Sequence, residues 1–230
     1  MANLFIVATP IGNLEDISLR ALRTLKEVDI ILCEDTRVTR KLLSRYDITT
    51  QVLSYHQHSQ LRKVNYIADL LREGKDLALV SDSGTPGISD PGNKLIDFLT
   101  RNNIDLRIIP IPGCSALITA ASISGFPMDR FTFLGFPPHK KKRNKFFEEL
   151  LKTEHPVIFY ESPHRIIKAL EEIGNKSEEF NIVPRIIVCR ELTKKFETIY
   201  RGLINEVIKN IKDDKIKGEF TVIIYKNYAI

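Results

Sequence analysis

The first half of the chain alternates short apolar runs with amphipathic segments, and this order restricts the folds open to it. Apolar runs predict strands at residues 3–8, 29–33, 76–80 and 105–109, with a shorter one near Val52. Helical spacing of apolar or small residues predicts helices at residues 17–27, 36–46, 59–73, 91–102 and 113–124. Such an alternation is typical of an α/β fold with a largely parallel sheet.

The pattern changes after residues 125–127, a Gly-Phe-Pro sequence that ends the last of these helices. Beyond it, strands are predicted at residues 131–134, 156–160, 185–189, 196–201 and 220–225. Helices are predicted at residues 141–152, 163–173 and 203–212. Because strands outnumber helices here, we expect a mixed sheet. The sequence therefore predicts an α/β protein of two domains, residues 1–123 and residues 124–230.

Composition and cysteine usage narrow the class of protein. Of the 230 residues, 43% are hydrophobic and 27% are charged, as is typical of soluble globular proteins. No apolar run is long enough to span a bilayer, and the first residues resemble a strand rather than a signal peptide. Cys33, Cys114 and Cys189 lie far apart, which indicates neither a disulfide framework nor a metal site. These features predict a cytoplasmic protein without a membrane partner.

Residues 81–92 form the most distinctive segment, directly after the strand predicted at residues 76–80. They contain three glycines, two prolines, three serines, one threonine and two aspartates, which excludes the interior of a helix or strand. The segment exceeds the usual connection of about 4–6 residues, and open α/β sheets bind ligands at the carboxyl ends of their strands. We therefore predict a ligand-binding loop. The glycine-rich turn of dinucleotide-binding folds and the P-loop are both absent from the sequence, so these two nucleotide sites are disfavoured.

Five further polar segments follow predicted strands or turns, where such sheets place their sites. They are residues 8–13, 33–37, 110–116, 160–165 and 189–197. Each also has an ordinary structural interpretation. Asp35 can cap a helix, and Ser162 can cap another that has Pro163 in its first turn. Glu191 and Lys194 can form a surface ion pair of little energetic worth. Taken together, five such strand ends in one short chain favour a common functional site.

A basic run lies near the start of the helix predicted at residues 141–152. The chain has a net charge of +5 and a pI of about 9.0, which permits contact with nucleic acid without requiring it. Cations at a helix N-terminus oppose the helix dipole and cost stability. This cost favours an anion-binding role for the run, which comprises His139, Lys140, Lys141, Lys142 and Arg143.

The polar segments together resemble the tetrapyrrole methylase superfamily of S-adenosylmethionine-dependent methyltransferases. Within it, they resemble the branch that methylates the ribose 2′-hydroxyl of a cytidine in small-subunit ribosomal RNA. The segments that carry the resemblance are residues 9–14, 34–37, 81–92, 112–116, 161–165 and 190–194. The chain departs from the family at Ser83, where alanine is usual, and at Cys114, where a proline or small residue is expected. Phe196 stands where a histidine is common, which argues against a catalytic histidine there.

The resemblance implies two α/β domains with S-adenosylmethionine bound in the cleft between them. By position, it implies cofactor contacts at Pro10, Ser83, Gly84, Thr85, Pro86, Ile88, Ser115, Ala116, Tyr160, Glu161 and Glu191. It further implies a homodimer whose substrate is small-subunit ribosomal RNA, either free or in the assembled subunit. Two alternatives stay open: a methyltransferase of the same fold that acts on a tetrapyrrole precursor or on protein diphthine, and a non-catalytic RNA-binding assembly factor.

A ribose hydroxyl is a poor nucleophile until it loses or shares its proton, so a carboxylate or histidine is needed near it. The candidates for this base are Glu34, Asp35, Glu161 and His164. Arginine and lysine suit the phosphates of RNA, arginine as a bidentate donor. The predicted RNA-binding residues are Arg37, Arg165, Arg190 and Lys194, together with Lys140, Lys141, Lys142 and Arg143.

Overall fold

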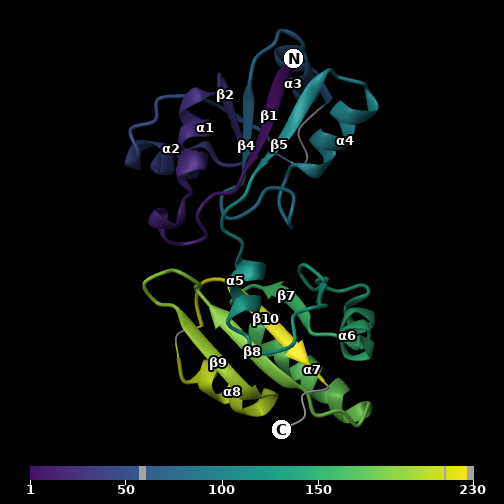
Figure 1. Cartoon of the computed structure of the whole chain (residues 1–230). Coiled ribbons are helices and arrows are strands. Elements are labelled where there is room, and N and C mark those ends of the chain that lie inside the picture. Colours follow the sequence, from purple (N-terminus) through teal and green to yellow (C-terminus); the bar gives the residue numbers. More distant parts are fainter. Residues whose placement is uncertain (57–60, 215, 227–230) are drawn as a thin grey trace. The chain divides into compact units, whose positions relative to one another are not determined.

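The computed structural model describes residues 1–56, 61–214 and 216–226. It divides the chain into two compact units, Met1–Ser115 and Ala116–Ile230. Each unit contains a five-stranded sheet (Figure 1). The first sheet is wholly parallel, and the second is mixed. The predicted α/β fold, with a parallel first sheet and a mixed second sheet, is therefore confirmed.

The sheet of the first unit has the strand order β3-β2-β4-β1-β5. Its strands are β1 (Ala2–Val7), β2 (Ile30–Cys33), β3 (Gln51–Ser54), β4 (Leu77–Val80) and β5 (Leu106–Ile111). Every residue of β2 and β4 is buried, as expected for central strands covered on both faces. Because all the strands run the same way, their carboxyl ends meet at one edge of the sheet.

Two pairs of helices cover this sheet. They are α1 (Leu19–Glu27), α2 (Thr36–Arg45), α3 (Leu61–Arg72) and α4 (Asn93–Arg101). The first two share a buried cluster with Ile31 and Val80, and the other two share a cluster with Leu32 and Leu79. Neighbouring residues of a strand point to opposite faces, so the two pairs lie on opposite faces of the sheet (Figure 1). Of the helix predicted at residues 59–73, residues 59 and 60 lie outside the described part.

The sheet of the second unit has the order β6-β7-β10-β8-β9. Its strands are β6 (Thr132–Phe133), β7 (Val157–Glu161), β8 (Arg185–Arg190), β9 (Thr198–Leu203) and β10 (Phe220–Tyr225). The pair β6–β7 is parallel, and the other three pairs are antiparallel. The last strand of the chain thus lies at the centre of its sheet, where β7 and β8 cover its two edges.

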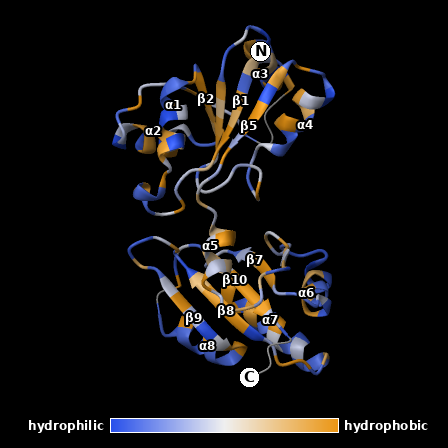
Figure 2. Cartoon of the chain, viewed as in Figure 1, coloured by the Kyte–Doolittle hydropathy of each residue, from blue (hydrophilic) through white to orange (hydrophobic). Residues whose placement is uncertain are grey.

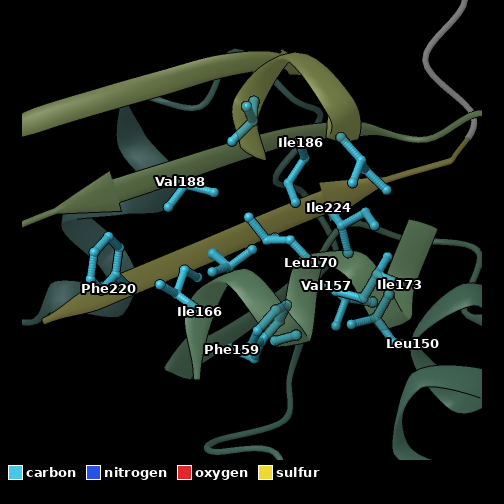
Figure 3. Close-up of a cluster of buried hydrophobic side chains, with 14 of the residues drawn as sticks. Leu150, Val157, Phe159, Ile166, Leu170, Ile173, Ile186, Val188, Phe220 and Ile224 are labelled. Atoms are coloured by element: carbon cyan, nitrogen blue, oxygen red, sulfur yellow. The ribbon is translucent and has the colours of Figure 1, made fainter. Parts of the chain in front are cut away.

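Three helices pack against one face of the second sheet, and a fourth packs against β7 and β10. They are α6 (Arg143–Lys152), α7 (Ile166–Glu179) and α8 (Ile204–Lys212), with α5 (Ala116–Ser122) as the fourth. Figure 3 shows Leu170 and Ile173 of α7 beside Val157 and Ile224 of the sheet. Fully burying a side chain of this size contributes about 1.5–3 kcal/mol, so this cluster is a main source of the unit's stability.

Two helices begin three residues later than the sequence predicts. The predicted helix at residues 113–124 begins at Ala116, and its contacts with β7 and β10 place α5 in the second unit. The helix predicted at residues 163–173 is α7, which begins at Ile166 and continues to Glu179. Among the described residues, no helix combines the length and the apolar character needed to cross a membrane.

Candidate functional site

The carboxyl edge of the first sheet brings four polar segments together. In chain order, they follow β1 at Thr9, β2 at Glu34, β4 at residues 81–92 and β5 at residues 112–115. The four strands are neighbours in the order β2-β4-β1-β5. Segments far apart in the sequence are therefore adjacent at this edge, which is where open α/β sheets bind their ligands.

Thr9 joins the first of these segments to the 81–92 loop. Its backbone N–H donates to the carbonyl of Gly84 at 2.9 Å, and its carbonyl accepts from the Gly84 N–H at 3.0 Å. Its buried hydroxyl donates to the carbonyl of Ser81 at 3.0 Å. The Ser81 hydroxyl in turn donates to the Gly84 carbonyl at 3.0 Å. These bonds hold the start of the loop in one shape without a ligand, which reduces the entropy lost when one binds.

The segment after β5 approaches the other two at the backbone. The hydroxyl of Thr85 donates to the carbonyl of Cys114 at 3.1 Å. A Cβ atom at Gly113 would meet the Cβ of Ala8 at 3.0 Å, so a larger residue would force the two segments apart. Gly84 has a φ of +84°, a conformation that favours glycine. The sequence-predicted cofactor contacts from Pro10 to Ser115 therefore lie on one continuous, hydrogen-bonded edge.

The two acidic residues after β2 differ in environment. Asp35 caps α2: its carboxylate accepts from the Arg37 N–H at 2.8 Å and pairs with the Arg37 guanidinium at 2.6 Å. These hydrogen bonds from Arg37 lower the pKa of Asp35 to about 2, which makes this carboxylate a weak base. The Asp35 N–H also donates to the Asp82 carboxylate at 3.0 Å. Glu34 is half-buried, and its side chain has no hydrogen-bond partner among the described residues.

In the second unit, Glu161 is a buried carboxylate held by two arginines. Its Oε1 accepts from the Arg165 guanidinium at 2.8 Å and from the Ser162 N–H at 2.8 Å. Its Oε2 lies 3.7 Å from Nη1 of Arg143 and has no hydrogen-bond partner in the described part of the chain. A buried charge requires such compensation. Glu161 therefore organises the turn after β7 and keeps one oxygen available.

That turn differs from the predicted capped helix. Because α7 begins at Ile166, the Ser162 hydroxyl does not cap it, and the Ser162 carbonyl instead accepts from the N–H groups of Arg165 and Ile166. The Arg165 side chain turns back to the buried carboxylate of β7 and also donates to the Pro137 carbonyl at 3.2 Å. The residue directly before α7 is thus committed to the ion pair with Glu161. His164 is exposed on this turn.

Tyr160 joins the end of β7 to the start of α5. Its hydroxyl accepts from the Leu117 N–H at 3.2 Å. Its ring packs against Phe133 and Phe136, with centroid distances of 5.0 and 5.5 Å. Two predicted cofactor contacts of this unit, Tyr160 and Ala116, are therefore close to each other.

Glu191 follows β8 in a left-handed turn with a φ of +52°, which is uncommon for a residue other than glycine. Its Oε1 accepts from Nζ of Lys194 at 2.8 Å and from the Glu219 N–H at 3.0 Å. Burial raises the pKa of Glu191, but these two hydrogen bonds outweigh burial and leave it lowered. A Cβ atom at Gly218 would overlap this carboxylate. Glu191 is therefore ionised at neutral pH and fixed in position.

The structure separates the predicted RNA-binding cations into three groups. The exposed group comprises Arg37, Lys140, Lys141 and Lys142. Arg165 and Lys194 are half-buried and paired with carboxylates. Arg143 and Arg190 are buried. Lys140, Lys141 and Lys142 are thus exposed and form no ion pair among the described residues, whereas phosphate binding by the other five would require a rearrangement of ion pairs.

The two buried arginines stabilise the fold of the second unit. Arg143 pairs with Glu172 at 2.6 Å and lies over the ring of Phe147, with 4.9 Å from Cζ to the centroid. Arg190 pairs with Asp214 at 2.7 Å. A charged group that is removed from water needs such partners, and a basic run in the sequence does not show which of its members has one. We therefore assign Arg143 and Arg190 a structural role.

Two residues that shape these sites, Glu172 and Gly218, have no role in the sequence-based prediction. Gly218 lies in a charged stretch before β10, and an isolated glycine there is a usable signal for a positive φ. Glu172 has charged neighbours along α7, and nothing in the sequence distinguishes it from them. Among the described residues, no group of three or more histidine, cysteine, aspartate or glutamate side chains could hold a metal ion.

The sequence matches the tetrapyrrole (corrin/porphyrin) methylases over residues 3–208. It is 46% identical over 229 residues to ribosomal RNA small subunit methyltransferase I of Mycoplasmopsis pulmonis, with 100% of both chains covered. It is 42% identical over 228 residues to the protein of that name from Thermotoga maritima, covering 97% of this chain and 98% of the relative. For the protein of that name from Halalkalibacterium halodurans, the identity is 45%, covering 97% of this chain and 76% of the relative.

Solved structures show the same fold at much lower sequence identity. A cobalt precorrin-4 methyltransferase of cobalamin biosynthesis has a TM-score of 0.71 at 19% identity, covering 97% of this chain and 94% of the other. A diphthine synthase has a TM-score of 0.73 at 13% identity, covering 100% of this chain and 92% of the other. At such identities the likeness concerns the fold alone.

Proposed function

The chain belongs to the tetrapyrrole methylase family, and we propose that it is an S-adenosylmethionine-dependent methyltransferase acting on the ribose 2′-hydroxyl of a cytidine in small-subunit (16S) ribosomal RNA. The observation that carries this proposal is the 42–46% identity, over nearly the whole chain, with small-subunit ribosomal RNA methyltransferases. The relatives of solved structure named for corrin and diphthine chemistry are only 13–19% identical.

Residues of both units suit S-adenosylmethionine, which supplies a methyl group already activated on a sulfonium. The carboxyl edge of the first sheet is preformed by hydrogen bonds through Thr9 and Gly84. On its loop, Ile88 is an apolar side chain that is 43% exposed, a suitable surface for an adenine ring. In the second unit, the ionised and fixed Glu191 suits a cationic amino group.

Glu34 is the residue that we propose as the base for the ribose hydroxyl. Transfer to a hydroxyl needs alignment of the reacting atoms and an acceptor for the proton. Glu34 is half-buried at the carboxyl edge, and its side chain forms no hydrogen bond or ion pair with the rest of the described chain. Asp35 is paired with Arg37 and has a low pKa. Glu161 is buried between two arginines, and its Oε1 is committed to Arg165 and to the Ser162 N–H, which leaves only Oε2 without a hydrogen bond in the described part of the chain.

Exposed cations of the second unit are proposed to bind the RNA backbone. Lys140, Lys141 and Lys142 are exposed, and the segment before them is held by the bonds of Arg143 and Arg165 to the carbonyls of residues 138 and 137. Such contacts add affinity that does not depend on base sequence and falls with salt. We further propose that the chain works in the cytoplasm as a homodimer, which sedimentation at several protein concentrations tests.

The deciding experiment measures methyl transfer from labelled S-adenosylmethionine to naked small-subunit ribosomal RNA and to assembled small subunits that lack the modification. Alkali-resistant label in one dinucleotide is expected, because 2′-O-methylation blocks cleavage there. Label in neither acceptor, with cofactor binding intact, would overturn the RNA assignment in favour of a tetrapyrrole or protein acceptor. Failure to bind the cofactor at all would overturn the methyltransferase assignment and favour a non-catalytic RNA-binding factor.

A further inference from the structure

Two helices of the first unit present a dense set of cations on one surface. We call it the α1–α2 basic face, defined by Arg20, Arg23, Lys26, Arg37, Arg40, Lys41 and Arg45, all of which are exposed. The only acidic residue within these two helices is Glu27. The helices share one buried cluster beneath them, so they lie on the same face of the sheet, and Figure 2 shows hydrophilic residues along both.

Most of these cations have no ion-pair partner. Arg37 pairs with Asp35, whereas the other six members form no ion pair or side-chain hydrogen bond among the described residues. The helices on the opposite face differ, because Arg72 there pairs with Asp69, and Arg101 pairs with Asp97. Six of the seven positive charges of the α1–α2 basic face therefore have no ion-pair partner within the described chain.

Part of this arrangement opposes helix stability, whereas Lys26 and Arg45 lie in the last turns of α1 and α2, where a cation favours the helix. Arg20 and Arg37 lie in the first turns of α1 and α2, where a cation opposes the helix dipole. Like charges three or four residues apart, such as Lys41 and Arg45, repel each other. Cations that lower helix stability and have no ion-pair partner are expected where a protein binds an anionic ligand.

The α1–α2 basic face also adjoins the proposed site. In each parallel β-α-β unit, the helix starts at the carboxyl edge of the sheet and runs back along it. Because α2 begins only two residues after Glu34, its first turn lies at the carboxyl edge, beside the proposed base. A depression of about 690 Å³ lies at the other end of α2, and the polar residues that line it are Arg40, Ser44, Asp47, Thr49, Thr50 and Gln51. Cationic and hydroxyl side chains of this kind are usual contacts of nucleic-acid phosphates.

We propose that the α1–α2 basic face binds the phosphate backbone of the RNA substrate and leads the strand to the carboxyl edge of the first sheet. This inference rests on the proposed function and adds a second RNA-binding surface, on a different unit from Lys140, Lys141 and Lys142. The chemistry it requires is a polyanion with regularly spaced phosphates, because the cations extend along both helices rather than converging on one point.

The test compares two double variants that each remove two positive charges. Arg40→Gln with Arg45→Gln removes two cations of the α1–α2 basic face. The matched control is Arg62→Gln with Lys94→Gln, which removes two exposed cations from α3 and α4 on the opposite face of the same sheet, neither of which forms an ion pair with another described residue. Glutamine keeps the helix propensity. Relief of repulsion in α2 favours folding, loss of the last-turn cation Arg45 opposes it, and a melting curve checks that the variant is folded.

Binding of naked small-subunit ribosomal RNA is measured over a series of KCl concentrations, beside cofactor affinity and methyl transfer. We expect the α2 variant to bind RNA ~10-fold more weakly, with a salt slope smaller by about two, and to keep its cofactor affinity. We expect the control to resemble the parent chain. Equal losses in both variants would overturn the inference, as would a loss of binding to anionic lipid vesicles with RNA binding unchanged.

The outcome is separable from the proposed function. If the parent chain methylates ribosomal RNA and the α2 variant binds RNA as well as the control does, the inference about the α1–α2 basic face is wrong and the proposed function stands. If the parent chain neither binds nor methylates ribosomal RNA, the proposed function itself fails, and the inference fails with it.

Discussion

Glu34 and Asp35 are adjacent carboxylates whose surroundings give them different chemistry. Asp35 is committed to Arg37 and to the first turn of α2, whereas Glu34 is half-buried and has no partner in the part of the chain that the structure describes. We expect Glu34→Gln to lower kcat by about 10²–10⁴-fold, because loss of a general base has effects of that size, with cofactor affinity retained. Single-turnover methyl transfer and calorimetric cofactor binding measure the two quantities. Unchanged turnover would remove Glu34 from the mechanism.

The ion pair of Glu191 and Lys194 predicts a pH dependence of stability. Burial opposes the charge on both groups, but hydrogen bonds outweigh it, so the pKa of Glu191 is lowered from 4.5 and the pKa of Lys194 is raised from 10.5. A lowered acid pKa contributes stability above 4.5 that is lost as the pH falls through the folded value. A raised lysine pKa contributes stability below 10.5 that is lost as the pH rises through the folded value.

We therefore expect Glu191→Gln to lower the melting temperature at neutral pH and to lose this difference as the pH falls below the unfolded pKa of 4.5. Differential scanning calorimetry of the parent and variant across acid pH measures the gap. A difference in melting temperature that stays constant as the pH falls would show that the carboxylate charge contributes nothing to stability. Side chains that are 18% and 29% exposed imply a modest effect.

Gly218 supports Glu191 by lacking a side chain. It has a φ of +92°, and a Cβ atom there would overlap the Glu191 carboxylate. The matched control is Gly125, in the same unit, with a φ of +73° and open space around its Cβ position. Left-handed strain alone costs about 1–2 kcal/mol, so Gly125→Ala should lose that amount. Gly218→Ala should lose more and should also weaken cofactor binding, as urea denaturation and calorimetry can show. Equal effects would exclude the steric role.

In the sequence, Arg143 belongs to the basic run. In the structure it is the first residue of α6, and its side chain is buried. It lies beside Glu161, pairs with Glu172 and donates to the Pro138 carbonyl. Breaking a buried pair from one side typically costs ~3–5 kcal/mol, so Arg143→Met should destabilise the chain by about that much. Lys145→Met changes an exposed cation of the same helix and should shift stability by less than about 0.5 kcal/mol. Similar urea midpoints for both variants would contradict the structural role.

The strands and helices were largely predictable because their apolar periodicity reports burial directly. Every predicted strand has a counterpart, as the buried runs of β2, β4 and β10 illustrate. Helix starts were less predictable, since they depend on competing partners. At α7, the turn of Arg165 back to Glu161 replaces the capped start that Ser162 and Pro163 indicate.

Candidate site residues were predictable as segments but not as individual roles. The sequence places residues 81–92 after a strand, and that is enough to expect a shaped loop. It does not show that Asp35 is committed to Arg37 or that Arg190 is committed to Asp214, because these pairings depend on side-chain geometry. The sequence also does not show that the side chains of the adjacent Glu34 and Asp35 have different surroundings.

Each of the two units has its own buried core and its own set of candidate cofactor contacts. The first has clusters on both faces of its parallel sheet, and the second has a cluster beneath α6, α7 and α8. The proposed cofactor contacts include Gly84 in one unit and Glu191 in the other. A ligand that binds only the native state stabilises it by about 2.7 kcal/mol at a concentration 100 times its Kd, and this applies to every unit that the ligand contacts.

Amide hydrogen exchange can therefore test whether S-adenosylmethionine engages both units. With saturating cofactor, we expect slower exchange at residues 81–92 of the first unit and at residues 190–194 of the second. The far ends of the helices, such as Arg45 and Lys212, serve as internal references, because they lie outside the proposed contacts. Protection confined to the first unit would remove Tyr160, Glu161 and Glu191 from the cofactor site. Protection in both would support a cofactor that contacts residues of both units.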